Sequence, residues 1–290
     1  MNCTILFPSD YFDITQIDEN FIAEFTEVCK IPELKIAFYN HDKFIYDNKL
    51  EFFPKIADIE KGLFICRTWM FKPHEYKRLY EKLFSYDIKL INSPDEYNKM
   101  HLFPLIYSDI VKFTPKTIFY ENITEINADL LNSTFTRFMI KDYVKSVKEH
   151  DFPKYFETPI TQDELKTQIN KFIELRASLF TGGIVFKEFV NLKKYGAVTN
   201  EYRVFYLKGE FLTVSRNSNQ PDNAPYVPQN FADKFKNLSS NYYTVDFAEL
   251  ENGDFIILEM GDGQVSGLSP NQYIFKYYDE LRRICELMGC

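Results

Sequence analysis

Residues 241–268, NYYTVDFAELENGDFIILEMGDGQVSGL, constrain the fold of this chain more than any other stretch. Asn252-Gly253 separates two runs rich in aromatic and β-branched residues, which is the strongest short-range signal for a β-hairpin with a two-residue loop. With these two residues as the loop, Glu251 lies opposite Asp254, and each step outward adds one pair. The register of the whole hairpin then follows from its turn.

This register places Asp246 directly opposite Glu259, and Phe247 opposite Leu258. Two carboxylates then share one face of an antiparallel pair, where like charges destabilise the sheet. Their neighbours along the strands are apolar: Val245, Phe247, Leu258 and Met260. We therefore expect a partly buried carboxylate pair, which must share a proton, find cationic partners or hold a metal ion.

The chain of 290 residues is long enough for one large or two ordinary domains, and its 45% hydrophobic and 17% aromatic content is that of a globular protein. No apolar run reaches the length of a membrane span and no signal-peptide pattern is visible, so we expect no membrane partner and a cytoplasmic location. The five cysteines lack a CxxC pair, which indicates reduced thiols. A net charge of −8 argues against a general nucleic-acid-binding protein but leaves room for ATP in a local basic pocket.

The first part of the chain alternates predicted strands with amphipathic helices, which is typical of a compact α/β unit with a parallel sheet. The strands are expected at residues 4–8, 34–39, 63–70 and 88–92, with a further short strand around residues 44–45. We place a domain junction near Thr114-Pro115, within a proline-containing segment. The predicted domains are therefore 1–113 and 114–290.

Basic residues open the second part of the chain. Lys141 follows an apolar run in a predicted strand, and Lys145 and Lys148 come shortly after it in a loop. A helix with a capping-box start is expected over 161–179, and a strand over 183–190. These lysines therefore precede the two hairpins of the C-terminal region.

A second hairpin is expected over 201–216, with a Lys-Gly dipeptide as its loop. In that register Glu201 lies opposite Arg216. Facing residues share a face of the sheet, as do residues two apart, so Glu201, Arg203 and Arg216 are expected on one face. One hairpin thus offers carboxylates and the other offers two arginines and a glutamate.

A polyphosphate bound with a divalent cation needs carboxylates for the metal and cations for the remaining phosphate oxygens. The second part of the chain offers both, although the sequence has no Walker A, GxGxxG or GxSxG motif and its histidines show no metal-ligand spacing. Plainer interpretations stay open at each position: solvated loop lysines, a simple Glu201–Arg216 ion pair, an exposed carboxylate face, an ordinary turn at Asp262, and a structural strand end at Arg67.

Several segments, taken in order, resemble the ATP-grasp superfamily, and in particular its clade named for two arginines and one lysine. They are CRTWM (66–70), TPKT (114–117), FMIKDYVKS (138–146), VFKEFV (185–190), NEYRVFYLKGEF (200–211) and VDFAELENGDFIILEMGDGQVSGL (245–268). The resemblance implies an α/β ATP-grasp fold. A Rossmann-like pre-ATP-grasp domain would precede two α+β lobes, about 114–182 and 183–290, which grip ATP between them.

The resemblance also implies roles for individual residues. Nucleotide binding would fall to Lys141, Lys145, Lys187, Glu188, Phe189, Val190 and Glu201, with the stretch from Lys187 to Val190 as the adenine-binding strand. The magnesium ligands would be Asp246, Glu259 and, in the place of a third ligand, Asp262. The remaining cations form the catalytic set: Arg203 near the γ-phosphate or the substrate carboxylate, Arg67 facing the acceptor pocket, and Arg216.

Two departures from the family pattern are visible. Many ATP-grasp enzymes carry Glu-x-Asn at the last metal strand, whereas Glu259 is followed by Met260-Gly261, so Asp262 stands one position too far. The glycine-rich phosphate loop of many members is also missing after Lys141. Phosphate cover would then rely on lysine charge more than on backbone amides.

The family chemistry predicts an ATP- and Mg²⁺-dependent ligase that joins a carboxylate to an amine through an acylphosphate. The expected partners are ATP and acceptors that bear the carboxylate and the amine, either small molecules or a peptide tail. Two alternatives stay open: a phosphotransferase that stops after transfer to a hydroxyl, and a nucleotide-binding protein without turnover. The departure after Glu259 keeps the last alternative open.

Overall fold

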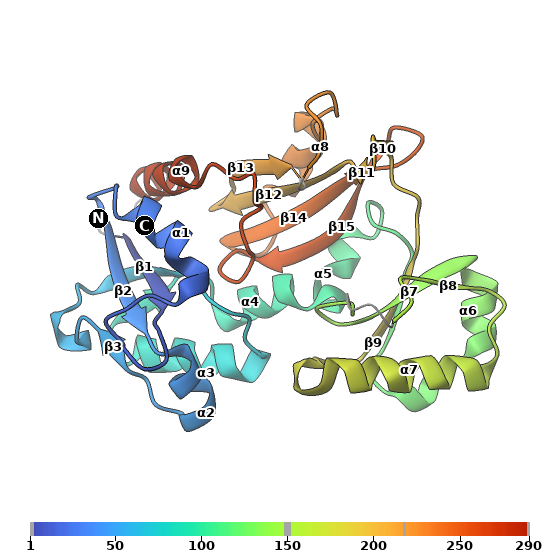
Figure 1. Ribbon diagram of the computed structural model, residues 1–290, viewed down its shortest axis with the longest axis horizontal. Helices are drawn as coiled ribbons and strands as arrows, with labels where there is room; N and C mark the ends of the chain where they lie inside the picture. Colours follow the sequence, from blue (N-terminus) through green and yellow to red (C-terminus); the bar gives the residue numbers. More distant parts are fainter. Residues whose placement is uncertain (1–2, 148–151, 217–218, 289–290) are drawn as a thin grey trace.

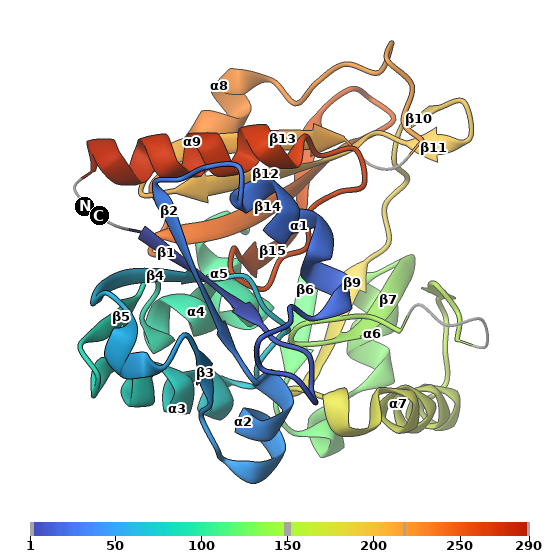
Figure 2. The same cartoon turned by 60° about the vertical axis from the view of Figure 1, so that its left-hand side comes forward.

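The computed structural model describes residues 3–147, 152–216 and 219–288, and its strands form three main sheets and one short ribbon. Figures 1 and 2 show the N-terminal sheet on one side of the molecule, the sheet of β12 to β15 above the centre, and the sheet of β6 to β9 on the other side. The C-terminal helix α9 (Ile274–Leu287) packs against both α1 and β13, so the last helix joins the N-terminal unit to the third sheet.

The first sheet has the strand order β3-β2-β1-β4-β5, with β2, β1, β4 and β5 parallel and β3 antiparallel. This confirms the expected α/β unit. The strands are β1 (Cys3–Pro8), β2 (Leu34–Tyr39), β3 (Phe52–Phe53), β4 (Gly62–Cys66) and β5 (Ile88–Leu90). The helices are η1 (Glu19–Phe21), α1 (Ile22–Val28), α2 (His41–Asp47), η2 (Ile56–Asp58), α3 (Pro73–Phe84), α4 (Pro94–His101) and α5 (Phe103–Ile110).

The short strand predicted around residues 44–45 is wrong, because helix α2 occupies this position. The Asn40 side chain caps the helix by accepting a hydrogen bond of 2.9 Å from the Lys43 amide, and Asn48 ends it in a left-handed conformation with φ of 55°. Asparagine tolerates both positions. Two capping signals therefore outweighed the β-propensity of the apolar pair between them.

The second sheet is antiparallel, with the order β6-β9-β7-β8. Its elements are β6 (Thr117–Tyr120), η3 (Ile123–Glu125), α6 (Ala128–Thr134), β7 (Arg137–Asp142), β8 (Phe156–Glu157), α7 (Gln162–Arg176), η4 (Ala177–Leu179) and β9 (Ile184–Glu188). Because β9 pairs with β6 and β7, sheet membership ends this lobe after residue 188, six residues beyond the expected boundary at 182.

The third sheet is also antiparallel, with the order β13-β12-β14-β15. Its region contains β10 (Lys194–Tyr195), β11 (Val198–Thr199), β12 (Glu201–Leu207), β13 (Glu210–Arg216), α8 (Gln229–Ala232), η5 (Asp233–Phe235), β14 (Tyr242–Glu249) and β15 (Phe255–Asp262). On one face, Phe205 and Tyr242 share a buried cluster with Ile5 of β1 and Tyr277 of α9. The opposite face packs on α4, α5, α8 and η5. The N-terminal domain thus covers part of both faces.

Among the described residues, no helix combines the length and the apolar character needed to cross a bilayer.

Helix α7 offers a matched test of the local signals. Thr161 accepts a hydrogen bond from the Glu164 amide at 3.3 Å while its own amide donates to the Glu164 carboxylate at 2.9 Å, whereas Thr167 lies exposed in the helix interior. We expect Thr161→Ala to lower the free energy of unfolding by about 1 kcal/mol, because it removes the cap. Thr167→Ala should be neutral or slightly stabilising, because alanine is the better helix former. Equal effects of both variants in urea unfolding would contradict this account.

Candidate functional site

The hairpin of β14 and β15 brings Asp246 and Glu259 opposite each other, as its sequence predicts. The loop length and the strand register that produce this pairing differ from the expected ones. Glu249 pairs with Phe255, and the Leu250 amide donates to the Asp254 carbonyl at 2.8 Å, so the loop has three residues, and Gly253 takes φ of 90°. A β-bulge then restores the offset: Phe247 faces Ile257, not Leu258. The extra loop residue shifts the register by one residue, and the bulged residue shifts it back, so that Asp246 again lies opposite Glu259.

Arg203, Asp246 and Glu259 form a row across three neighbouring strands, because Arg203 of β12 pairs with Asp246, which pairs with Glu259. Paired residues share a face, so all three side chains project into the same space. Arg216 is not part of this row. A bulge between Phe205 and Tyr206 pairs Arg216 with Tyr202 and sends it to the other face of the sheet.

The structure therefore corrects the prediction that Arg216 shares a face with Glu201. The Arg216 guanidinium lies 4.3 Å from the centre of the Tyr226 ring and donates to the Asp222 carboxylate at 2.9 Å. In the second hairpin the loop keeps its two expected residues, so nothing compensates for the bulge. A catalytic role for Arg216 has no support in this position.

Each carboxylate of the row has a cation of its own. Arg203 makes a bidentate pair with Asp246, with Nε to Oδ1 at 2.8 Å and a second nitrogen to Oδ2 at 2.6 Å. Glu259 accepts from Lys141 Nζ, which comes from β7 of the second sheet. Burial tends to raise the pKa of Glu259, but Lys141 and Lys145 outweigh it and hold that pKa at about 2. Such a pair can share a proton, find cationic partners or hold a metal ion, and here each carboxylate has a cationic partner.

Lys187 of β9 lies beneath this row. It is 3% exposed, donates through Nζ to the Leu258 carbonyl, and stands 4.3 Å from the centre of the Phe103 ring. Burial, together with the positive charge of Lys141, lowers the pKa of Lys187 to about 7. Because the carbonyl belongs to the bulged Leu258, the irregularity that aligns the carboxylates also supplies an acceptor for a buried lysine.

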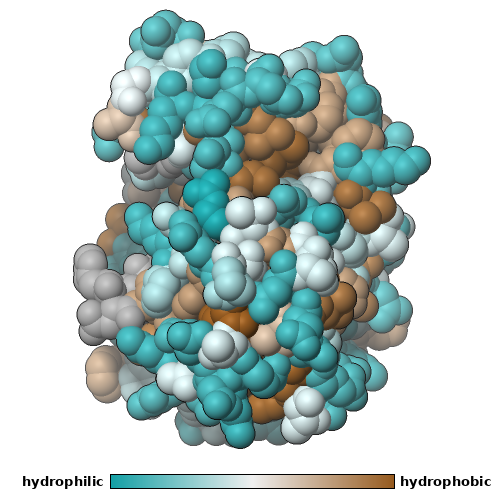
Figure 3. All heavy atoms as spheres, turned by 90° about the vertical axis from the view of Figure 1, so that its right-hand side faces the viewer, coloured by the Kyte–Doolittle hydropathy of each residue, from teal (hydrophilic) through white to brown (hydrophobic). Residues whose placement is uncertain are grey.

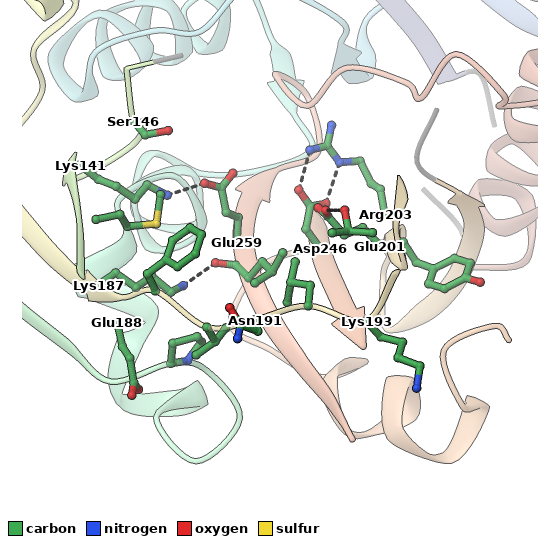
Figure 4. A pocket seen from close by; sticks show the side chains of 18 of the residues that line it. Lys141, Ser146, Lys187, Glu188, Asn191, Lys193, Glu201, Arg203, Asp246 and Glu259 are labelled. Carbon is green, nitrogen blue, oxygen red and sulfur yellow. Dashed lines mark hydrogen bonds and ion pairs between the residues drawn. The ribbon is translucent and has the colours of Figure 1, made fainter. Parts of the chain in front are cut away.

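A cleft of 1110 Å³ opens above these residues, between the second and third sheets. Ten of the thirteen predicted site residues line it: Lys141, Lys145, Lys187, Glu188, Phe189, Val190, Glu201, Arg203, Asp246 and Glu259. In Figure 4, Lys141 and Lys187 approach from the second sheet, and Glu259, Asp246 and Arg203 from the third. Figure 3 views the molecule from the side of α6 and α7, where apolar patches lie between hydrophilic side chains.

Sequence reasoning missed several polar residues of the cleft: Ser146, Asn191, Lys193, Lys194, Thr199 and Ser269. Most of them follow β9, in the segment that connects the two lobes. The sequence does contain a signal for them. The predicted adenine-binding stretch ends at Val190, and the polar residues that follow it directly in the chain could have been expected to line the same cleft. Lys148, named among the basic loop residues, lies outside the described residues.

Arg67 does not face the cleft. It is 1% exposed and makes a bidentate pair with Glu24, with nitrogen–oxygen distances of 2.8 and 3.0 Å. Its third contact is the Gly263 carbonyl, at 2.5 Å. Because Arg67 directly follows β4, its side chain lies in the interface between the first and third sheets. The prediction that Arg67 faces the acceptor pocket is therefore corrected: Arg67 forms a buried ion pair with Glu24.

Asp262 is also displaced from the predicted site. It is three residues from Glu259 in one strand, and an odd spacing sends side chains to opposite faces. Asp262 is fully buried and accepts from Asn92 at 2.5 Å and from the Gln264 amide at 2.9 Å. Burial, partly offset by these hydrogen bonds, raises its pKa to about 7. It therefore ties β15 to the N-terminal domain and cannot join Glu259 on one ion.

The donor set for a metal is consequently two carboxylates. No group of three or more His, Cys, Asp or Glu side chains suited to a metal occurs within the described ranges. Asp246 and Glu259 are oxygen donors, paired across two strands and partly open to the cleft, with 21% and 35% of their side chains exposed. Such a pair fits Mg²⁺, which commonly takes one or two carboxylates and completes its shell with phosphate oxygens and water.

Two lobes that face each other across a charged cleft, behind a parallel α/β domain, are the features that the resemblance to ATP-grasp proteins implied. A model of the ATP-grasp domain, for family 3 of the clade named for two arginines and one lysine, matches residues 130–281, which is just over half of the chain. The chain therefore belongs to this family of ATP-grasp proteins. No curated protein matches it at the sequence level.

Solved structures share the fold at low identity. The D-alanine–D-alanine ligase from Bacillus anthracis complexed with ATP is 13% identical with a TM-score of 0.58, and all of both chains is covered. The macrocyclase MdnC bound with precursor peptide MdnA, from Microcystis aeruginosa MRC, is 13% identical over 97% of this chain and 99% of its own, with a TM-score of 0.55. The ATP-grasp ligase PsnB, complexed with a phosphomimetic variant of its minimal precursor, Mg and ADP, is 10% identical over 97% of both chains, with a TM-score of 0.57. These likenesses confirm the fold.

The low pKa of Lys187 predicts a pH dependence of stability. An unfolded lysine takes up its proton below a pKa of ~10.4, whereas folded Lys187 does so only below about 7. Between these values the unfolded chain binds more protons, so stability rises with pH, and the penalty of charging the buried amine is fully present below the lower value. Lys187→Met should stabilise the ligand-free protein near neutral pH and remove up to one proton from the slope, ~1.4 kcal/mol per pH unit.

Urea unfolding from about pH 6 to about pH 10 measures this slope. Lys194→Met, at the exposed rim of the same cleft, is the matched control and should behave as the wild type. A slope that Lys187→Met leaves unchanged would show that the buried amine is charged throughout.

Proposed function

We propose that this protein is an ATP- and Mg²⁺-dependent ligase that joins a carboxylate to an amine through an acylphosphate. One observation carries the proposal: Asp246 and Glu259 stand side by side at the floor of the cleft of an ATP-grasp chain, with Arg203, Lys141 and Lys187 around them. This is the charge pattern that a metal-bound polyphosphate requires, with oxygen donors for the ion and cations for the remaining phosphate oxygens.

The existing ion pairs suggest how the site accepts its ligand. Phosphate oxygens would bind Arg203 and Lys141 in place of the carboxylates. Asp246 and Glu259, released from these ion pairs, would then hold Mg²⁺. The bound metal supplies charge neutralisation across the phosphates. Lys187 sits deeper, and a polyanion beside it would favour its protonated form. The cations of this chain would thereby stabilise the charge that develops on the transferred phosphoryl group.

From the remaining residues we infer which end of the cleft binds the adenine and which end admits the acceptors. We place the adenine against Phe189 and Val190, at the exit of β9, with Glu188 and Glu201 toward the ribose and Lys145 near the phosphates. The acceptors then enter beyond Arg203. Among the structural neighbours, MdnC is bound with a precursor peptide, so a peptide tail and a small molecule are both within the range of this fold. The proposed domains are 1–113 and 114–290, with the lobe boundary after β9.

A second candidate function is nucleotide binding without turnover. It is favoured by Gly261, which stands where many ATP-grasp enzymes carry a third metal ligand, and by Asp262, which is buried away from the cleft. Two carboxylates are enough to bind Mg²⁺ with a nucleotide. Product analysis tests whether they also suffice for transfer of the phosphoryl group.

Turnover distinguishes the candidates. We expect ADP to appear only when a carboxylate and an amine are supplied together, because the acylphosphate must be consumed by the second substrate. ADP formation from a hydroxyl acceptor alone would indicate the phosphotransferase instead. Binding of Mg·ATP in calorimetry, with no ADP under any acceptor screen, would leave the binding protein as the function.

The metal assignment has its own test. Glu259→Gln and Asp246→Asn should lower Mg·ATP turnover by about 10² or more while the circular dichroism spectrum stays that of the wild type, because each removes one anionic ligand without a change of shape. Glu251→Gln is the matched control, since this carboxylate lines the mouth of the cleft on the hairpin loop. Turnover that survives in Glu259→Gln would refute the assignment.

A further inference from the structure

The segment after β15, residues 263–270, joins the N-terminal domain to the cleft, and we refer to it as the strap. At its far end, Leu268, Ser269 and Pro270 line the cleft. Just before them, the Gly267 carbonyl accepts a hydrogen bond of 2.9 Å from the Arg203 guanidinium. This nitrogen is the one that Arg203 leaves free of Asp246, so the strap fixes the third corner of the guanidinium.

At its near end, the strap is held by residues that immediately follow β4. Arg67 donates to the Gly263 carbonyl at 2.5 Å, and the Thr68 amide donates to the Gln264 carbonyl at 3.1 Å. Glu24 in turn holds Arg67 in a bidentate pair, and the Tyr278 hydroxyl donates to Glu24. A fully buried guanidinium with every direction constrained is a rigid anchor.

The approach of the strap to this anchor depends on glycine. A Cβ added at Gly263 would lie 2.7 Å from the Tyr242 ring, closer than any side chain allows. Further along, the Ser266 hydroxyl donates to the Asp262 carbonyl at 2.8 Å and lies 2.9 Å from the Thr244 hydroxyl. The turn is therefore held by hydrogen bonds at Gly263, at Ser266 and at Gly267.

We propose that Arg67 is a positioning residue: from the N-terminal domain it fixes the strap at Gly263, and through the Gly267 carbonyl it sets the orientation of Arg203 in the cleft. Arg67 itself touches no ligand. Its effect on the phosphate end of the site would be exerted through Arg203 alone. The inference rests on the proposed function, because it takes the Arg203 end of the cleft as the phosphate end.

A double-mutant cycle tests this route. Arg67→Lys keeps the charge but cannot reproduce the fork that holds Glu24 and Gly263 together. We expect it to weaken the binding of a non-hydrolysable Mg·ATP analogue about tenfold and to leave the binding of adenosine unchanged, because adenosine does not reach Arg203. In the Arg203→Met background the same change should have no further effect on binding of the Mg·ATP analogue, since the residue through which it acts is gone.

Controls separate positioning from general damage. Arg78→Lys is matched, because Arg78 also lies in the N-terminal domain, donates to a carbonyl (Phe44, 2.9 Å) and covers an aromatic ring, but makes these contacts away from the strap. This variant should bind the Mg·ATP analogue as the wild type does. If Arg67→Lys does not fold, Ser266→Ala replaces it in the cycle, with a smaller loss in the same direction.

The outcomes are distinct. Equal losses for adenosine and the Mg·ATP analogue, or losses that multiply in the double variant, would overturn the positioning role. In the ligand-free protein, amide hydrogen exchange over 264–267 should rise in Arg67→Lys and not in Arg78→Lys, and unchanged exchange would also overturn it. If exchange rises in Arg67→Lys but the wild type does not bind the Mg·ATP analogue, the proposed function is refuted, and with it the link from the strap to a phosphate site.

Discussion

The cleft depends on mutual neutralisation of charge between two sheets. Asp246 and Glu259 face each other across two strands, an arrangement that is unfavourable unless each carboxylate has a cation. Arg203 serves the first from the neighbouring strand, and Lys141 serves the second from the opposite sheet. The Lys141–Glu259 pair also joins the two lobes at the floor of the cleft, whereas the Arg203–Asp246 pair lies within the third sheet. In the proposed function a metal-bound polyphosphate would replace these pairs, because it carries both the positive and the negative charge needed to do so.

One face of the third sheet serves the site and the core together. Along β12, Arg203 projects into the cleft, while Phe205 and Leu207 on the same face pack into the core that the sheet shares with the N-terminal domain. The change from polar to apolar happens within two residues. The N-terminal domain is consequently part of the support of the cleft, and the buried polar contacts of Arg67 and Asp262 lie where the two units meet.

The hairpins show how far local signals reach. The Asp246–Glu259 pairing could be predicted because Asn-Gly marks the turn. The pairing is nevertheless correct only because the shift in register from the longer loop is reversed by the bulge at Leu258. In the second hairpin a bulge stands alone, and Arg216 moves to the other face. The parallel sheet, the lysine on β7 and the stretch from Lys187 to Val190 were accessible from periodicity and from the family resemblance. The helix at residues 41–47 is not predicted, because the apolar pair at 44–45 favours a strand locally, whereas the caps that decide for a helix, Asn40 and Asn48, lie outside that pair.

The sequence by itself determined the alternation that builds the sheets, the order of the charged segments and the family to which they belong. Only the tertiary structure decided which charges meet. A single bulged residue reverses the face of everything beyond it, and no local pattern announces it. Burial decided the rest: Arg67 and Asp262 carry the residue types of a catalytic site, but each found a partner in the interface with the N-terminal domain, where a buried charge or carboxylate must be satisfied. These partners, Glu24 for Arg67 and Asn92 for Asp262, lie far from them in the chain, so no local pattern predicts the contacts.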